Sequence, residues 1–260
     1  FRKYHQNQIT FSFMYAYSEN YVLVLSHDEV VHLKKSMIYK MPGTMPEKFG
    51  NLRAAYGLMM MHPGKKLLFM GQDFAQTAEW NEAKSLDWHL LEKYPEHQQL
   101  NHYYCDLLHF YQNEPALYEL DDSPEGFAWI NGSDAEHNML TFCRMTKDKK
   151  NCLLCHFNFS PVAYENFQSG VLCPGTYTEV FNSNAAEYGG TGLVNPEPIE
   201  AVKESWDFKD YSIKYHLGAY GVCIFKFDYV EPKPEEPQKP AKRYTKEDIH
   251  KLAGHYKKVK

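Results

Sequence analysis

Tyr21-Val-Leu-Val-Leu25, followed at once by Ser26-His-Asp-Glu29, is the stretch that decides how the first half of this chain folds. A short, continuously apolar and β-branched run of this kind is typical of a strand buried on both faces of a parallel sheet. The run ends abruptly in polar side chains. We therefore expect a strand over residues 21–25 with titratable groups at its C-terminal end.

The same pattern repeats downstream, with a helix between the two strands. Residues 46–62 carry apolar side chains at spacings of three and four, which predicts a helix that ends before Gly64. Residues 66–70 predict a second short strand, and residues 96–111 predict the next helix. This alternation indicates a parallel α/β architecture with its active site at the C-terminal ends of the strands. A closed (β/α)8 TIM barrel needs eight strands, so the part before Gln112 predicts only the C-terminal portion of one, with the other units upstream.

From about residue 125 the pattern changes to short apolar runs separated by Gly, Pro, Asn and Asp. Such runs are typical of an antiparallel β-sandwich. They lie at residues 127–130, 139–143, 152–157 and 222–225. We therefore predict a barrel portion over residues 1–118, an all-β C-terminal domain over 119–228 and an extended tail over 229–260.

The tail has its own composition. Residues 231–240 are rich in Pro and charge, which predicts an extended linker, and residues 245–260 predict a short basic helix. We expect a solvated extension rather than a binding element, because charged tails of this kind are common.

Composition narrows the class of protein. The chain of 260 residues is 43% apolar, which suits a globular protein, and its net charge of -5 disfavours nucleic acid as a partner. No apolar run approaches the roughly 20 residues of a membrane span. Six irregularly spaced cysteines favour a reducing cytoplasm over a disulfide framework. The first residue is Phe1 and no signal peptide is visible, so we expect a fragment.

Several titratable groups crowd the loop after the first strand, and three interpretations compete for it. A zinc site is disfavoured because His27 and His32 are five residues apart and follow a strand, whereas the zinc-protease motif needs a spacing of four on a helix. A structural loop, with Asp28 capping backbone amides, remains open. The third interpretation is sugar chemistry, which needs carboxylates near an oxocarbenium-like transition state.

Two other motifs favour structural roles. Cys152 and Cys155 are three apart in a predicted strand, so their side chains should point to opposite faces, which favours core cysteines over a redox or metal pair. The segment Glu187-Tyr-Gly-Gly190 predicts a surface turn, because glycines permit positive φ angles.

Longer motifs favour the sugar interpretation by resemblance. They resemble branching enzymes in glycoside hydrolase family thirteen. Residues 26–43 resemble the seventh-strand region, residues 62–91 resemble the eighth-strand region, and the similarity continues to about residue 227. The main motifs are Ser26-His-Asp-Glu-Val-Val-His32, Lys40-Met-Pro-Gly43, His62-Pro-Gly-Lys-Lys-Leu-Leu-Phe-Met-Gly71, Glu79-Trp-Asn81, Ser85-Leu-Asp-Trp-His-Leu-Leu91, Asn113-Glu-Pro-Ala-Leu117 and Glu187-Tyr-Gly-Gly190.

The resemblance implies roles for particular residues. Asp28 corresponds to the carboxylate that stabilises the transition state, and His27 to the histidine that binds sugar hydroxyls beside it. Glu29, Lys34, Trp80 and Asn81 are expected to contact substrate, although Trp80 is equally explained as a packing residue. The nucleophile and the acid/base of such enzymes lie on earlier strands.

The loop after Asp28 departs from the family pattern. Leu33 and Lys35 stand where the family usually has glycines, and Asp73 stands where it usually has Glu.

The resemblance implies a 1,4-alpha-glucan branching activity in glycogen biosynthesis, in which an α-1,4-glucan is cut and its piece is passed to a 6-hydroxyl. We expect glycogen or amylose-like chains as partners, no nucleic acid or membrane partner, no cofactor or metal, a monomer and a cytoplasmic location. This chain alone is expected to be inactive. A hydrolase of the alpha-amylase superfamily and a non-catalytic glucan-binding remnant are the alternatives.

Overall fold

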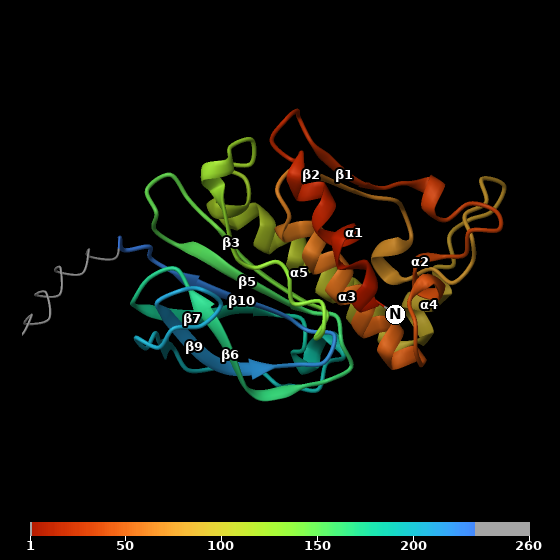
Figure 1. Cartoon of the computed structure of the whole chain (residues 1–260). Helices are drawn as coiled ribbons and strands as arrows, with labels where there is room; N and C mark the ends of the chain where they lie inside the picture. Colours follow the sequence, from red (N-terminus) through yellow and green to blue (C-terminus); the bar gives the residue numbers. More distant parts are fainter. Residues whose placement is uncertain (1, 232–260) are drawn as a thin grey trace, which may run out of the picture. The chain divides into compact units, whose positions relative to one another are not determined.

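A pair of parallel strands opens the fold, with one long helix between them in the chain (Figure 1). β1 (Val22–Leu25) pairs with β2 (Lys65–Leu68) in a register that sets Val22 beside Lys65 and Leu25 beside Leu68. The helix α3 (Met45–Met61) starts at a capping box in which Thr44 and Glu47 bond to each other's backbone amides. The predicted strand, helix and parallel strand are therefore confirmed.

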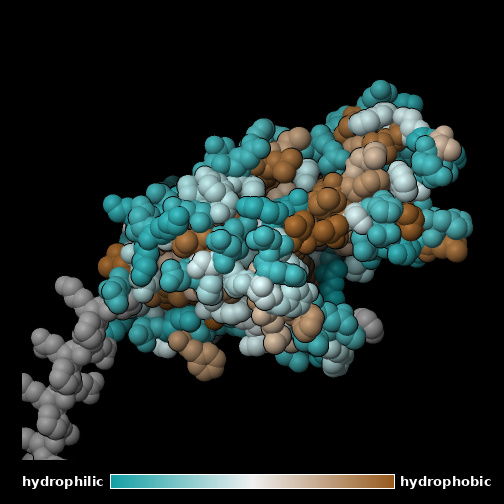
Figure 2. Space-filling view, turned by 90° about the horizontal axis from the view of Figure 1, so that it is seen from above, coloured by the Kyte–Doolittle hydropathy of each residue, from teal (hydrophilic) through white to brown (hydrophobic). Residues whose placement is uncertain are grey.

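β1 is not buried on both faces, which corrects the expectation from its apolar sequence. The side chains of Val22 and Val24 are 46% and 48% exposed, and Leu67 on β2 is also exposed. The physical reason is that this sheet has two strands within residues 2–231, so no further strand or helix covers that face. Figure 2, seen from the side of β1 and β2, shows a strip of apolar side chains among polar ones.

The second half of the chain forms two antiparallel sheets. In the larger one the strand order is β3-β4-β5-β10-β7-β8, and β6 and β9 form the smaller one. Val171, Ile213 and Leu217 of the smaller sheet share a core with Cys143, Leu154 and Phe225 of the larger one. The predicted antiparallel sandwich is thus present. Its strands are β3 (Phe127–Asn131), β4 (Met139–Arg144), β5 (Cys152–Asn158), β6 (Tyr164–Val171), β7 (Thr176–Asn182), β8 (Ile199–Glu200), β9 (Tyr211–Leu217) and β10 (Val222–Phe227).

Two helices cover the other face of the larger sheet (Figure 1). α3 and α5 (Pro95–Asn113) pack on each other, and α3 also contacts β5 and β10. Gly57 lets the two layers approach closely, because a Cβ there would lie 2.7 Å from Val222 Cγ2. The central strands β4 and β5 are consequently buried along their whole length instead of alternating between core and solvent.

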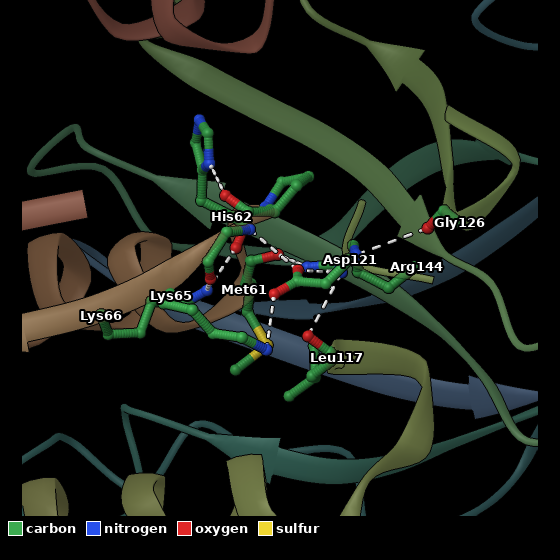
Figure 3. Close-up of polar contacts among 10 residues, drawn as sticks. Met61, His62, Lys65, Lys66, Leu117, Asp121, Gly126 and Arg144 are labelled. Carbon is green, nitrogen blue, oxygen red and sulfur yellow. Dashed lines mark hydrogen bonds and ion pairs between the residues drawn. The ribbon is translucent and has the colours of Figure 1, made fainter. Parts of the chain in front are cut away.

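A buried ion pair joins the part that carries β1 and β2 to the sandwich (Figure 3). Arg144 on β4 is fully buried and donates from Nη2 to Asp121 Oδ1 at 3.0 Å. It also donates to the carbonyl of Met61, at the end of α3, at 2.7 Å. Asp121 in turn accepts from the amide of Gly64 at 2.8 Å and from Lys65 Nζ at 3.3 Å. The start of β2 is therefore fixed by the sandwich.

A second contact between the helices and the sandwich is made by Tyr188. The turn around Gly189 has the predicted positive φ, at 78°. Tyr188, however, is buried, donates its hydroxyl to Asp106 Oδ2 on α5 at 2.8 Å and stacks on Phe181. The expectation of a simple surface turn is therefore wrong for this residue, because its ring fills the space between α5 and β7.

The computed structural model describes residues 2–231, so the predicted basic helix and nearly all of the predicted linker lie outside the described residues. None of the helices in this range is long and apolar enough to cross a membrane. The remaining elements are short. They are η1 (Arg2–His5), α1 (Gln6–Thr10), η2 (Phe11–Met14), η3 (His27–Glu29), α2 (Met37–Lys40), η4 (Gln72–Phe74), α4 (His89–Lys93), η5 (Pro115–Leu117), η6 (Pro124–Gly126) and η7 (Ala186–Tyr188).

Candidate functional site

The candidate site lies at the C-terminal ends of β1 and β2. Directly after β1 the chain enters the short 3-10 turn η3, and the hydroxyl of Ser26 caps it by accepting the amide of Asp28 at 3.2 Å. His27 and Asp28 are both exposed here, with His27 Nε2 3.5 Å from Asp28 Oδ1. The turn therefore presents an imidazole and a carboxylate to solvent, side by side, at a strand end.

Aromatic rings from the end of β2 hold His27. Its imidazole lies edge-on to Trp80, with ring centroids 5.6 Å apart, and it also contacts Phe69 at 6.0 Å. The amide of Trp80 donates to the carbonyl of Val30 at 2.8 Å, which fixes the β2 loop against the β1 loop. Two residues that the sequence assigned to the site, His27 and Trp80, are thus brought into contact. Trp80 is half-buried against the core, so it packs and still offers part of its ring.

Glu79 locks the loop that follows Asp28. Its carboxylate accepts the amides of Leu33 and Lys35, at 3.0 and 2.7 Å. These two bonds hold the pKa of Glu79 below its usual range, because they favour the ionised form. His32 Nδ1 lies 3.8 Å from the same carboxylate. No role was predicted for Glu79 from the sequence, although its position within the Glu79-Trp-Asn81 motif was a signal that could have indicated one.

The same loop adopts the backbone conformation that glycines favour. Leu33 has φ 68° and Lys35 has φ 64°, both left-handed. The family that this chain resembles usually has glycines at these two positions. This chain keeps the left-handed loop conformation without glycines. The two hydrogen bonds to Glu79 offset the free-energy cost of that backbone conformation.

The remaining predicted site residues are less tightly placed. Glu29 and Lys34 are exposed on the β1 loop, and Asn81 is exposed on the β2 loop, where its side chain accepts the amide of Ala83 at 2.9 Å. Among the described residues, none of these three side chains makes a hydrogen bond or ion pair with Asp28. The structure therefore groups them around the same loops but joins only His27, Trp80 and Asp28 directly.

Two alternatives to sugar chemistry, a metal site and a redox cysteine pair, concern other side chains of residues 2–231. In the part of the chain that the structure describes, no group of three or more His, Cys, Asp or Glu side chains is placed to hold a metal ion. Cys152 and Cys155 are both free and buried, and they belong to the cores on opposite faces of the large sheet. The prediction that they are core cysteines facing apart is confirmed.

Comparison with known proteins agrees with the motifs. Residues 129–228 match the family described as alpha amylase, C-terminal all-beta domain. The chain is 44% identical over 227 residues to the 1,4-alpha-glucan branching enzyme GlgB of Oceanobacillus iheyensis, which covers 87% of this chain and 36% of that protein. It is 46% identical to the enzyme of the same name from Halothermothrix orenii, over 87% of this chain and 36% of that protein.

A third relative of the same name, from Aquifex aeolicus, is 46% identical over 228 residues, with 88% of this chain and 36% of that protein covered. The chain thus spans about a third of the length of the curated relatives it matches. The chain is therefore related to the 1,4-alpha-glucan branching enzymes, as its motifs indicated, and its residues 129–228 are similar to the alpha-amylase C-terminal all-beta domain.

Proposed function

We propose that this chain is the C-terminal portion of a 1,4-alpha-glucan branching enzyme, which cuts an α-1,4-glucan and transfers the piece to a 6-hydroxyl to make an α-1,6 branch. The observation that carries the proposal is the identity of 44–46% to three such enzymes over 87–88% of the chain. The arrangement of that loop at the end of a parallel strand supports it, because barrel enzymes keep their chemistry there.

We propose further that β1 and β2 are two neighbouring strands of a (β/α)8 barrel. Three observations support this: the strands are parallel, a helix lies between them in the chain, and Val22, Val24 and Leu67 leave an apolar face exposed. An apolar cavity of about 500 Å³ lies beside β1 and reaches α3, lined by residues such as Leu25 and Leu58. A sheet that continued past β1 would cover this apolar surface.

In this proposal Asp28 stabilises positive charge that develops on the sugar ring, and His27 binds a hydroxyl next to it. A carboxylate suits the first role because an oxocarbenium-like transition state gains charge that the ground state lacks. The imidazole suits the second because Trp80 and Phe69 fix its plane. Trp80 also offers an apolar ring to a sugar face, with Glu29, Lys34 and Asn81 around it.

This chain alone should not catalyse the reaction. Retaining cleavage needs a nucleophilic carboxylate and a separate acid/base carboxylate about 5–5.5 Å apart. Glu79, beside the loop, is already committed to the amides of Leu33 and Lys35. We therefore propose that both groups come from other strands of the complete enzyme, which acts as a cytoplasmic monomer on glycogen or amylose-like chains.

The experiment that tests the proposal is to express the complete coding sequence that contains this chain and to incubate the product with amylose. Proton NMR then measures new α-1,6 linkages, and a reducing-sugar assay measures free chain ends. A branching enzyme makes α-1,6 linkages with few new reducing ends. Reducing ends without branches would instead indicate a hydrolase. If neither reducing ends nor branches form, the remaining interpretation is a non-catalytic glucan-binding protein.

A further inference from the structure

A cavity of about 440 Å³ opens on the β-sandwich, and none of its lining residues belongs to the β1–β2 site. It lies where β3, β6 and the tip of the hairpin before β9 meet. Its size is within the roughly 300–1,000 Å³ that ligand pockets occupy. The lining residues on which its chemistry depends are Asn131, His156, Asn166, Phe167, Trp206 and Asp207.

Both strands that border the cavity are irregular next to it. The pairing of β3 with β4 shifts between Trp129 and Asn131, and the pairing of β6 with β9 shifts between Tyr164 and Phe167. Bulges of this kind re-aim side chains and are over-represented beside functional sites. Here the first shift precedes Asn131 and the second contains Asn166, so two of the three side-chain amides that line the cavity sit at a bulge, the third being Gln168.

The hairpin tip is held in a conformation that its sequence disfavours. Trp206 pairs with Lys209, and the two residues between them, Asp207 and Phe208, have φ angles of 51° and 58°. Two-residue turns of this type favour Asn or Asp followed by Gly, and an aromatic residue is rarely found there. Phe208 is nevertheless present and fully exposed.

The cavity wall holds this strained tip in place. Asp207 Oδ1 accepts from Asn131 Nδ2 at 2.8 Å, and its Oδ2 accepts the amide of Gly170 at 2.9 Å. Trp206, next to it, lines the cavity and is 45% exposed. Strain that is actively maintained beside a cavity, with unprotected aromatic rings, points to a binding function.

A buried histidine in the cavity wall has an unused hydrogen-bonding atom. His156 Nδ1 lies 2.8 Å from both the hydroxyl of Thr141 and that of Tyr215. Its Nε2 is buried without a hydrogen-bond partner, which is costly for a polar atom. Burial also lowers the pKa of His156 to about 3, so the ring is neutral at physiological pH.

The lining selects the chemistry of a ligand. It contains no Lys or Arg, and its acidic residues are already partnered within the protein. Asp134 Oδ1 lies 2.7 Å from His137 Nδ1, and Asp207 accepts from Asn131 and from the amide of Gly170. Amides, a neutral imidazole and exposed aromatic rings suit a neutral ligand that has both hydroxyls and flat apolar faces. We propose that this cavity is a second α-glucan-binding site on the sandwich, in which Trp206 stacks on a sugar ring and Asn166 bonds its hydroxyls. The choice of α-glucan as the sugar rests on the proposed function.

The test is a titration of the ¹⁵N-labelled chain with maltoheptaose, followed by NMR. The four tryptophans give separate indole N–H signals, which a Trp206→Ala variant assigns. The signals of Trp206 and of the Asn166 side chain should shift, and Trp206→Ala should weaken this binding about tenfold, as for a central interface aromatic. Asn166→Ala, at an exposed position, should weaken it about threefold. Tyr118 is an exposed aromatic residue that is absent from the cavity lining, so Tyr118→Ala should leave the affinity for maltoheptaose unchanged.

The outcomes separate this proposal from the proposed function. Saturable shifts at Trp206 support the cavity whether or not the complete protein makes branches. Absence of shifts, or unchanged binding in both Trp206→Ala and Asn166→Ala, overturns it even if branching occurs. Shifts at Trp206 that depend on protein concentration, with a dimer in sedimentation, would assign the surface to a second copy and also overturn it.

Discussion

Replacing Arg144 with Met should destabilise the protein strongly, because it breaks the buried joint of Figure 3. The variant keeps an apolar stem of similar length but removes the guanidinium. Four hydrogen bonds disappear with it, to Asp121 and to the carbonyls of Met61, Leu117 and Gly126, at distances from 2.7 to 3.4 Å. All four acceptors lie where β4, the end of α3 and the chain before β3 come together.

The size of the expected loss in stability follows from the interactions that Asp121 keeps in the variant. Removing one partner of a buried ion pair costs about 3–5 kcal/mol, because the other charge is left in a poorly solvated place. Asp121 keeps the amide of Gly64 and the ammonium of Lys65, so we expect the lower end, about 3 kcal/mol. These interactions, with nearby Lys66, also hold the pKa of Asp121 below its usual range although its burial acts to raise it. The double variant Arg144→Met with Asp121→Asn should recover about 1–2 kcal/mol of this loss, since no buried carboxylate is left without its guanidinium and the exposed Lys65 is solvated by water.

Urea unfolding followed by circular dichroism at pH 7 measures the effect. With a slope of about 1–3 kcal/mol per molar, the midpoint should fall by about 1 M or more. Lys214→Met is the matched control, because Lys214 pairs with Glu204 at 3.7 Å on the surface, and it should cost less than about 1 kcal/mol. A loss for Arg144→Met as small as that of the control would refute the assigned role of the joint.

Three further predictions concern single positions. Gly57→Ala should destabilise the protein by about 1–3 kcal/mol in the same urea assay, because the added Cβ would collide with Val222 and this outweighs the better helix propensity of Ala. A gain in stability would contradict the close approach of α3 to the sheet. Leu33→Gly should leave the stability unchanged or raise it by up to about 1 kcal/mol, because Gly has no penalty at φ 68°, and a clear loss would argue against the left-handed loop. Burial lowers the pKa of His62 to about 4 and that of His156 to about 3. As the pH falls, both histidines are therefore protonated in the unfolded chain before they are protonated in the folded protein. Stability should therefore fall as the pH decreases below about 6.5, by about 2 kcal/mol for each histidine between pH 7 and 5, and equal urea midpoints at the two pH values would contradict this.

Much of the architecture could be predicted from local sequence. The strands near residues 21–25 and 66–70, the helix between them and the polar residues at the strand ends all follow from hydrophobic patterns, and the structure confirms them. The four apolar runs of the second half are strands as well. Four further strands, β6 to β9, were not predicted, since sequences such as Tyr164-Glu-Asn-Phe-Gln-Ser-Gly-Val171 show no clear alternation.

The burial of individual strands was predicted wrongly, because burial depends on neighbours that are distant in sequence. The apolar run of β1 indicated cover on both faces, yet Val22 and Val24 are exposed. Conversely, an antiparallel sandwich usually leaves one face of a sheet to solvent, whereas α3 and α5 cover that face of β4 and β5. No local pattern states which helix will lie on which sheet.

The candidate site was only partly visible in the sequence. Its position after β1 followed from the pattern, and the roles of Asp28 and His27 came from resemblance. Glu79 was not predicted as the residue that holds the loop, because a carboxylate bonded to two amides 44 and 46 positions away leaves no local trace. The buried Arg144 was missed for a related reason: an arginine within a strand is normally assumed to face solvent.

The most direct test of the central claim compares two aspartates in the complete protein. Asp28→Asn and Asp122→Asn both neutralise an exposed carboxylate, but Asp28 follows the C-terminal end of β1, whereas Asp122 lines a cavity beside the starts of β1 and β2. We predict that Asp28→Asn lowers kcat for α-1,6 branch formation on amylose by about 10²–10³-fold with an unchanged urea midpoint, and that Asp122→Asn leaves kcat unaltered. Near-normal branching by Asp28→Asn would contradict the assignment of this strand end as part of the catalytic site.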